Sequence, residues 1–333
     1  MKKILILGAA GFLGHHLEHR MKAEGHYVVS VARKHPPYRK SVANEFNILD
    51  LTNVSDFHSH FFRHQFDECY ALAGEVGGLG YISEPANDAA ILTNSLKINL
   101  HTLEAIARTG NCKRIFFASS HCVYPNRHEI DPFAQERLTI HRPNSPRETN
   151  AQFDGNMAFA KEKLYAEALY TAMAAAHGFE ARIGRLGNTY GPYCTWEGPR
   201  AKSVAALCRK VAEAPYAGVI DVWGDGQQTR SFTYVDDVIE GMVRLMASDC
   251  REPVNIAHGE PVRIGDLVDT ICNVAGKIVG VNYTDGPVGP RHRGSDNEFC
   301  KHVLGWEPSI GLRQGLELTY PWIKEQVLTR GDG

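Results

Sequence analysis

Short apolar runs alternate with longer, helix-like segments over the first 120 residues of the chain. The apolar runs predict strands at residues 3–7, 26–31, 69–72 and 114–118, and the segments between them predict helices at residues 12–24, 55–64 and 89–109. Strands that alternate with helices in this way form a parallel sheet with helices on both faces. We therefore expect an α/β fold built on a doubly wound parallel sheet.

The second half of the chain continues this pattern and then becomes less regular. It predicts a long alanine-rich helix at 158–177, a strand at 180–186, a short helix at 201–214, a strand at 221–226, a return to the main sheet at 231–235, and amphipathic helices at 264–275 and 312–326. We expect one domain from residues 1–186 with 227–260. A smaller, discontinuous C-terminal domain would comprise residues 187–226 and 261–330.

Composition excludes several classes of protein. The formal net charge of −2 gives no strong attraction to nucleic acid or to an anionic membrane. No apolar run approaches the roughly 20 residues of a bilayer span, and the apolar start breaks at Gly8, so we interpret it as mature structure. The eight cysteines form no CxxC pair, which is typical of a reducing, cytoplasmic location. We expect no metal site.

A glycine-rich turn is the clearest local motif. Gly8, Gly11 and Gly14 follow the first predicted strand and lead into the first predicted helix. Gly8 permits the tight turn, Gly11 lets the backbone approach a pyrophosphate, and Gly14 lets the helix pack on the strand. Phe12 and Leu13 contribute the first N–H groups of the helix, whose positive end attracts phosphate. This pattern predicts a Rossmann-type dinucleotide site.

The adenosine side of that site is less regular. An acidic residue usually follows the second strand and binds the ribose hydroxyls of NAD, but this chain has Arg33 there. Arg33 favours the 2′-phosphate of NADP, with a solvated basic turn as the alternative. Asp50 and Leu51 follow an apolar run and suit a contact with the adenine edge.

Several motifs together resemble the extended short-chain dehydrogenase/reductase family, in its NAD-dependent epimerase/dehydratase branch. They are the GxxGxxG turn, Ser119-Ser120, Lys163, the segments GRLGNTYGP and WGDGQQTRSF, and LGWEP near the C-terminus. Four more segments are similar to the GDP-mannose 3,5-epimerases within that branch: EVGGLG at 75–80, SSHCVYP at 119–125, TWEGPRAK at 195–202 and RHRGSDN at 291–297. The resemblance spans nearly the whole chain and makes the C-terminal domain a nucleotide-sugar-binding domain.

The resemblance implies an isomerase that uses NAD. Such an enzyme oxidises carbon 4 of a hexose transiently, exchanges protons at carbons 3 and 5, and returns the hydride. Cys122 and Lys202 match the acid/base pair. A thiol serves as base when its thiolate is stabilised, and a lysine serves as acid when it is partly desolvated. A buried packing thiol and a surface lysine are the alternatives for these two residues.

The resemblance also assigns substrate contacts. Arginine and lysine suit a diphosphate because their hydrogen bonds to it are charge-assisted. Ala201 stands where the family has an acidic residue, so that contact is lost here. The implied substrate is a GDP-linked sugar, and the helices at 89–109 and 158–177 are expected to form the contact of a homodimer. The expected substrate-binding residues are Gly78, Ser120, Cys122, Asn188, Lys202, Lys210, Gln228, Arg230 and Arg293.

One position departs from the family in a way that affects the chemistry. The family has a tyrosine four residues before its lysine, so that both lie on one helix face, and the lysine lowers the pKa of the phenol. Here the pair is Phe159 and Lys163, and Ser120 alone is a poor substitute. Three interpretations stay open: an engineered change, a natural homologue that has lost or changed its redox step, or His121 as the replacement base.

Two other functions compete with the epimerase hypothesis. Arg33 and the missing acidic residue favour an NADP-dependent nucleotide-sugar reductase or dehydratase that consumes its cofactor. Phe159 favours a redox-impaired variant or a non-catalytic binding module on the same fold, because one fold supports many functions.

Overall fold

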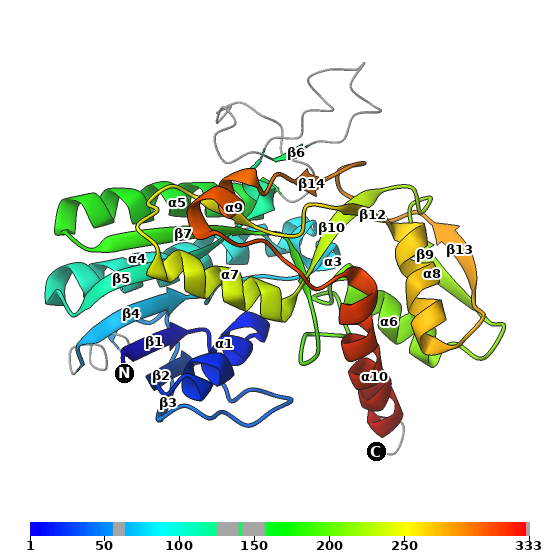
Figure 1. Cartoon of the computed structure of the whole chain (residues 1–333), viewed down its shortest axis with the longest axis horizontal. Helices are drawn as coiled ribbons and strands as arrows, with labels where there is room; N and C mark the ends of the chain where they lie inside the picture. Colours follow the sequence, from blue (N-terminus) through cyan, green and yellow to red (C-terminus); the bar gives the residue numbers. More distant parts are fainter. Residues whose placement is uncertain (56–63, 125–139, 142–156, 331–333) are drawn as a thin grey trace.

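The structure is a computed structural model that describes residues 1–55, 64–124, 140–141 and 157–330. Its main sheet has seven parallel strands in the order β11-β7-β5-β4-β1-β2-β3 (Figure 1). This order is the Rossmann arrangement, and it reverses between β1 and β4, where such sheets bind ligands. The predicted fold class is confirmed. The strands are β1 (Lys3–Leu7), β2 (Tyr27–Ala32), β3 (Glu45–Ile48), β4 (Phe66–Ala71), β5 (Cys112–Ser120), β7 (Glu180–Leu186) and β11 (Val254–Ile256).

Helices cover both faces of the sheet (Figure 1). α4 (Asp88–Thr109) and α5 (Met157–His177) pack on one face, and α1 (Phe12–Ala23) and α7 (Val235–Ala247) pack on the other. Side chains alternate across a strand, so β1 directs Ile4 and Ile6 into one apolar cluster and Leu5 and Leu7 into the other. Burial of each such side chain contributes about 2 kcal/mol. The two-sided burial explains why β1 is apolar at every position after Lys3.

The C-terminal elements gather beyond the carboxyl ends of the strands. α6, α8 and α10 pack on one another, beside the parallel pair of β9 and β13 (Figure 1). None of the described helices combines the length and apolar character that a membrane span requires. The remaining elements are α3 (Leu79–Ile82), η1 (Pro85–Asn87), η2 (His121–Val123), β6 (Ile140–His141), β8 (Asn188–Tyr190), α6 (Ser203–Glu213), β9 (Val219–Trp223), β10 (Thr229–Tyr234), β12 (Pro261–Arg263), α8 (Ile264–Ala275), β13 (Gly280–Thr284), β14 (Gly294–Ser295), α9 (Glu298–Leu304) and α10 (Leu312–Arg330).

The strand expected at 231–235 does not return to the main sheet. It is β10, which pairs with β8 and β12 in a separate three-stranded sheet. The chain returns through β11 after α7, because β10 leads directly into that helix. β3, α7 and α9 lie in segments where no element was expected, and the helix expected at 55–64 falls mostly outside the described residues. The domain boundaries stay a prediction.

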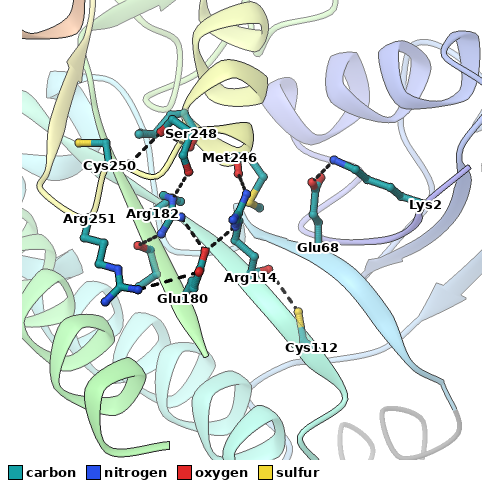
Figure 2. Close-up of polar contacts among 12 residues, drawn as sticks. Lys2, Glu68, Cys112, Arg114, Glu180, Arg182, Met246, Ser248, Cys250 and Arg251 are labelled. Atoms are coloured by element: carbon teal, nitrogen blue, oxygen red, sulfur yellow. Dashed lines mark hydrogen bonds and ion pairs between the residues drawn. The ribbon is translucent and has the colours of Figure 1, made fainter. Parts of the chain in front are cut away.

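A polar cluster lies at the amino-terminal end of β7, opposite the carboxyl ends of the strands, and links β5, β7 and α7 (Figure 2). Glu180, which begins β7, accepts hydrogen bonds from Arg114 Nε at 2.7 Å and Arg182 Nη2 at 2.6 Å. The two arginines also donate to the carbonyls of Met246 and Ser248 at the end of α7. These bonds link two strands to a helix. They lie at the amino ends of the strands, away from the carboxyl ends where such sheets bind ligands.

Candidate functional site

The glycine turn connects β1 to α1 at the edge where the strand order reverses. Gly8 has a φ of 88°, and a Cβ there would lie 2.7 Å from the backbone nitrogen of Ala73. A Cβ on Gly14 would lie 2.3 Å from the carbonyl oxygen of Gly8. Both glycines are therefore required for this close packing, as expected. Gly11 forms the N-cap of α1 with no side-chain cap, and it is exposed, which leaves the helix N-terminus available to a pyrophosphate.

The other expected cofactor residues lie around this turn. Phe12 and Leu13 occupy the first turn of α1 and are half-buried. Asp50 is exposed, and the pKa of its carboxyl lies below its usual range because Thr52 donates a backbone hydrogen bond to it at 2.9 Å. Leu51 is buried in the core. The turn and its surroundings fit a dinucleotide.

Arg33 follows β2 and ends near a carboxylate. Its Nη2 lies 3.6 Å from Oε1 of Glu75, while the side chain is 62% exposed. The guanidinium thus has an acidic partner inside the protein, on the loop after β4. This contact is an alternative to the 2′-phosphate expected from sequence.

Ser120 and Cys122 form a tight turn at the end of β5. Ser120 Oγ accepts a hydrogen bond from the backbone N–H of Cys122 at 3.2 Å, which starts η2. Arg293 Nη1 donates to Cys122 Sγ at 3.8 Å. A charged donor of this kind stabilises negative charge on sulfur. The thiol is half-buried rather than enclosed in the core.

Lys202 reaches the same region from a different loop. Its pKa lies below the usual range because the side chain is desolvated, an effect that the nearby Cys122 and Cys194 sulfurs oppose. The two expected acid/base residues are therefore close enough to interact electrostatically. Lys202 is the N-cap residue of α6, so the loop that carries it leads directly into that helix.

Gly78 holds the Lys202 loop against the loop after β4. Its N–H donates to the carbonyl oxygen of Arg200 at 3.0 Å, and a Cβ on it would lie only 2.1 Å from the carbonyl oxygen of Ala201. The lack of a side chain at Gly78 therefore allows this contact. The structure gives this residue a packing role next to Lys202.

Glu75 is a residue that the expected site did not include. Its buried carboxylate accepts hydrogen bonds from Arg200 Nη2 at 2.7 Å, Tyr81 Oη at 3.2 Å and Asn94 Nδ2 at 3.4 Å. Burial raises the pKa of Glu75, but Arg200 outweighs burial and leaves the pKa below its usual range. The segment EVGGLG was singled out only by resemblance, and the pairing of Glu75 with Arg200 could not be predicted from spacing.

Of the two expected substrate arginines, Arg230 lies in β10 and Arg293 lies next to that strand. Arg293 is held next to β10 by a backbone hydrogen bond, in which its N–H donates to the carbonyl oxygen of Thr229 at 3.2 Å. Arg230 is buried, and its Nη2 donates to the carbonyl oxygen of Val288 at 2.6 Å. Arg230 and Arg293 thus lie on adjacent backbone segments, and the guanidinium of Arg293 contacts Cys122.

The other expected substrate residues each donate a hydrogen bond to a backbone carbonyl oxygen. Asn188 Nδ2 donates to the carbonyl oxygen of Ser231 at 3.2 Å, and Lys210 Nζ donates to that of Asp221 at 2.6 Å. Gln228 is buried and donates to the carbonyl oxygen of Trp223 at 2.8 Å. It borders a cavity of about 760 Å³ that is lined by Gly224, Asp225, Gln228, Tyr283, Thr284, Asp285, Val288, Gly289 and Arg291.

Phe159 and Lys163 lie on α5 where it faces the ends of β4 and β5. Phe159 is buried in an apolar cluster with Tyr81, Ile82 and Ile91, against which Cys122 also packs. Lys163 is buried, and its Nζ lies 5.6 Å from the ring centroid of Phe159 and 3.4 Å from Glu162 Oε2. The lysine thus lies beside a ring that carries no proton to exchange.

His121 is a poor replacement for the missing phenol. Burial, together with Arg293 and Arg185, lowers its pKa to about 3. A group with so low a pKa takes up little proton at neutral pH. The structure therefore argues against the hypothesis that His121 has become the base of a hydride step.

A parallel sheet with a glycine turn at its switch point defines a Rossmann-type dinucleotide-binding protein. The chain belongs to the NAD dependent epimerase/dehydratase family, whose model matches residues 4–257.

Relatives of the chain are nucleotide-sugar enzymes. It is 37% identical over 327 residues to GDP-mannose 3,5-epimerase 1 of Oryza sativa subsp. indica, covering 98% of this chain and 82% of that protein. It is 38% identical over 328 residues to GDP-mannose 3,5-epimerase of Arabidopsis thaliana, covering 98% and 83%. UDP-glucose 4-epimerase of Thermotoga maritima, solved with UDP-glucose, has the same fold, with a TM-score of 0.80, 22% identity, and coverage of 98% of this chain and 99% of that one.

Proposed function

We propose that this chain is a nucleotide-sugar epimerase that exchanges protons at carbons 3 and 5 of a GDP-linked hexose. The observation that carries the proposal is that Cys122 and the loop of Lys202 pack against the same segment of the chain. Cys122 packs against the cluster that contains Tyr81 and Ile82, and Gly78 lies against Ala201 and Lys202. The GDP-mannose 3,5-epimerases among its relatives support the sugar and the nucleotide. The exchange needs a ketone at carbon 4, because a carbonyl acidifies the C–H bonds on either side of it.

The side chains around Cys122 and Lys202 suit that chemistry. The guanidinium of Arg293 lies against the Cys122 sulfur, and we assign to that sulfur the removal of a proton from carbon. The lowered pKa of Lys202 means that its ammonium gives up a proton more readily than an exposed lysine does. One residue then removes a proton from one face of the ring while the other returns a proton to the opposite face.

The glycine turn and Lys163 would hold NAD in the crevice at the switch point, and bound NAD supplies reversible hydride transfer at carbon 4. The absence of Cβ atoms at Gly8 and Gly14 supports this fit. The proximity of Arg33 to Glu75 supports NAD over NADP, because that guanidinium has an internal partner. The chain's own proton acceptor for hydride transfer is lacking at Phe159.

The nucleotide would bind across the three-stranded sheet. We assign the diphosphate to Arg230 and Arg293, and we assign contacts with the ribose, the sugar or the base to Asn188, Lys210 and Gln228. The cavity next to Gln228 has room for the nucleoside, since small-molecule sites typically enclose about 300–1,000 Å³. Its aromatic and acidic lining, Tyr283 and Asp285, suits a base with N–H donors.

We also propose that the protein is located in the cytoplasm and forms a homodimer. Eight free cysteines, with no disulfide among the described residues, support a reducing compartment. α4 and α5 pack together and expose large apolar side chains, Leu100 at 41% and Tyr165 at 67%, which supports a second copy of this face as partner. Scattering mass in solution tests the dimer.

The test of the function uses the Phe159→Tyr variant with GDP-mannose and NAD. Epimerised GDP-hexose with no net change in the amount of reduced cofactor is the expected result. Stoichiometric consumption of reduced cofactor with formation of a reduced sugar would establish the reductase alternative instead, and a 4-keto-6-deoxy sugar formed with no net cofactor change would establish the dehydratase alternative. A variant that binds both ligands, retains its fold and forms no product would count against epimerisation of GDP-mannose and would support the binding-module alternative.

A further inference from the structure

The site contains an acid/base pair suited to proton exchange, but it lacks the proton acceptor that hydride transfer from a hydroxyl needs. Cys122 has Arg293 as a charged donor, and the pKa of Lys202 is lowered by burial. Hydride transfer from a hydroxyl additionally needs a group that accepts the hydroxyl proton. The usual acceptor in this position is a phenol, and Phe159 has none.

Phe159 is integrated into its surroundings as an apolar residue. It is buried against Tyr81, Ile82 and Ile91, in a cluster that extends to Cys122. Lys163 Nζ lies over two rings, 4.9 Å from the centroid of Phe117 and 5.6 Å from that of Phe159. The lysine is also near Glu162. Its positive charge is thus stabilised without a phenolate.

The other residues near Phe159 do not replace the phenol. Burial and two arginines keep His121 neutral. Ser120 Oγ accepts the backbone N–H of Cys122, and a serine hydroxyl without a strong base beside it is a weak proton acceptor. Tyr81 Oη donates to Glu75, so its hydroxyl points into the Arg200 network. Among the described residues, the hydride step therefore has no evident base.

We propose that the unmodified chain acts on a nucleotide-linked 4-ketohexose, a sugar that is already oxidised at carbon 4, and epimerises it at carbons 3 and 5 without a hydride step. This inference rests on the proposed roles of Cys122 and Lys202. An oxidation or a dehydration of a GDP-hexose must supply such a substrate. A reduction at carbon 4 is the class of reaction that would consume the product.

The reaction balances without an oxidant. The Cys122 thiolate takes the proton from the carbon next to the ketone, so a C–H bond breaks, an S–H bond forms and the electron pair moves into an enolate. The Lys202 ammonium donates a proton to the opposite face of that carbon, so an N–H bond breaks and a C–H bond forms. Solvent then restores the proton on Lys202 and removes the one on Cys122. Arg230 and Arg293 hold the diphosphate throughout.

The experiment incubates the unmodified protein in D2O with a GDP-linked 4-keto-6-deoxyhexose, and separately with GDP-mannose and NAD. Mass spectrometry and NMR measure deuterium at carbons 3 and 5. The keto sugar is expected to gain deuterium at least about a hundredfold faster than in buffer alone, the range that a positioned acid or base contributes. GDP-mannose is expected to gain none.

Three variants make each outcome decisive. Cys122→Ala should abolish exchange while still binding GDP in calorimetry, and Phe159→Tyr should gain turnover of GDP-mannose. Tyr216→Phe, which changes an exposed phenol on the loop after α6, should behave as the parent. Turnover of GDP-mannose by the unmodified chain, or no exchange of the keto sugar when Phe159→Tyr does turn over GDP-mannose, overturns this inference alone. No exchange by either protein on either sugar overturns the proposed function as well.

Discussion

Arg200 Nη2 donates to Glu75 Oε2 at 2.7 Å, although 125 residues separate the two along the chain. Arg200 also stacks over the ring of Tyr81, with 3.7 Å between its Cζ and the ring centroid. Lys202 follows two residues later on the same loop, and Arg33 approaches the same carboxylate from the cofactor side. Glu75 therefore connects the region expected to bind cofactor with the loop that carries the proposed acid.

Glu75→Gln tests that connection. The variant keeps the shape of the side chain but removes the charge that holds Arg200. We expect the free energy of unfolding to fall by about 1–2 kcal/mol. Hydrogen bonds to charged groups contribute about 1.5–3 kcal/mol, and the partial exposure of Arg200 reduces that contribution. Proton exchange in the Phe159→Tyr background should also slow by about tenfold, as Lys202 becomes less well positioned.

The matched control for this change is Glu317→Gln. Glu317 forms an exposed ion pair with Arg313 on α10, which should contribute less than about 0.5 kcal/mol. Urea denaturation measures both variants. A loss at Glu75 no larger than at Glu317, with unchanged exchange, would contradict the role given to Glu75.

Gly78→Ala tests the contact between the two loops. The φ of Gly78 is −71°, which any residue adopts, so only the 2.1 Å clash with the carbonyl oxygen of Ala201 opposes the new methyl group. The Lys202 loop must shift, and we expect kcat in the Phe159→Tyr background to drop by about a hundredfold. Gly311→Ala, where a Cβ meets no atom within 4 Å, should leave kcat unchanged. Steady-state kinetics would refute this prediction if the two variants behaved alike.

Arg33→Ala tests the choice of cofactor. Because the guanidinium lies near Glu75, we expect NAD affinity to stay within about threefold of the parent, and NADP to bind the parent at least about tenfold more weakly than NAD. Calorimetric titration of both cofactors measures this. Tighter binding of NADP by the parent that disappears in Arg33→Ala would show instead that Arg33 binds a 2′-phosphate.

The cluster in Figure 2 predicts a pH dependence of stability. Burial raises the pKa of Glu180, but Arg114 and Arg182 outweigh it, so its folded pKa lies below the ordinary value of 4.5. A carboxylate of this kind stabilises the fold above its ordinary pKa, and the contribution is lost as pH falls through the folded pKa.

Glu180→Gln should therefore be less stable than the parent by about 2 kcal/mol at neutral pH, because Arg114 and Arg182 lose a charged partner. The difference should shrink below pH 4.5 and approach zero as the parent's carboxyl becomes protonated. Denaturant titrations from neutral pH down to about pH 3 check this. A difference that stays constant with pH would rule out the charge as its cause.

Local features of the fold could be predicted from sequence. β1, the glycine turn and α1 were expected within one residue of their observed bounds, because a buried strand and a helix start each leave a short-range pattern. β3 was missed because Glu45 and Asn47 interrupt its apolar residues. β10 was placed in the wrong sheet because alternation identifies a strand but does not identify its partners.

The site could be predicted only where a motif resembled a family. Cys122 and Lys202 were identified in that way, and their proximity depends on how the loops fold. The Glu75–Arg200 pair and the cavity beside Gln228 were missed, since both join segments that are far apart in sequence. The sequence showed that Phe159 departs from the family's tyrosine, but only the structure showed that Phe159 packs in an apolar cluster.

Deuterium at single carbons tests the acid/base pair most directly. The Phe159→Tyr variant, given GDP-mannose and NAD in D2O, should place solvent deuterium at carbons 3 and 5 of the hexose and none at carbon 4. Cys122→Ala and Lys202→Met in that background should still bind the nucleotide. The rate at which deuterium enters carbons 3 and 5 should fall by at least about a hundredfold in each. Label that persists in both double variants, or that never enters carbons 3 and 5 of a sugar that is turned over, would contradict the account.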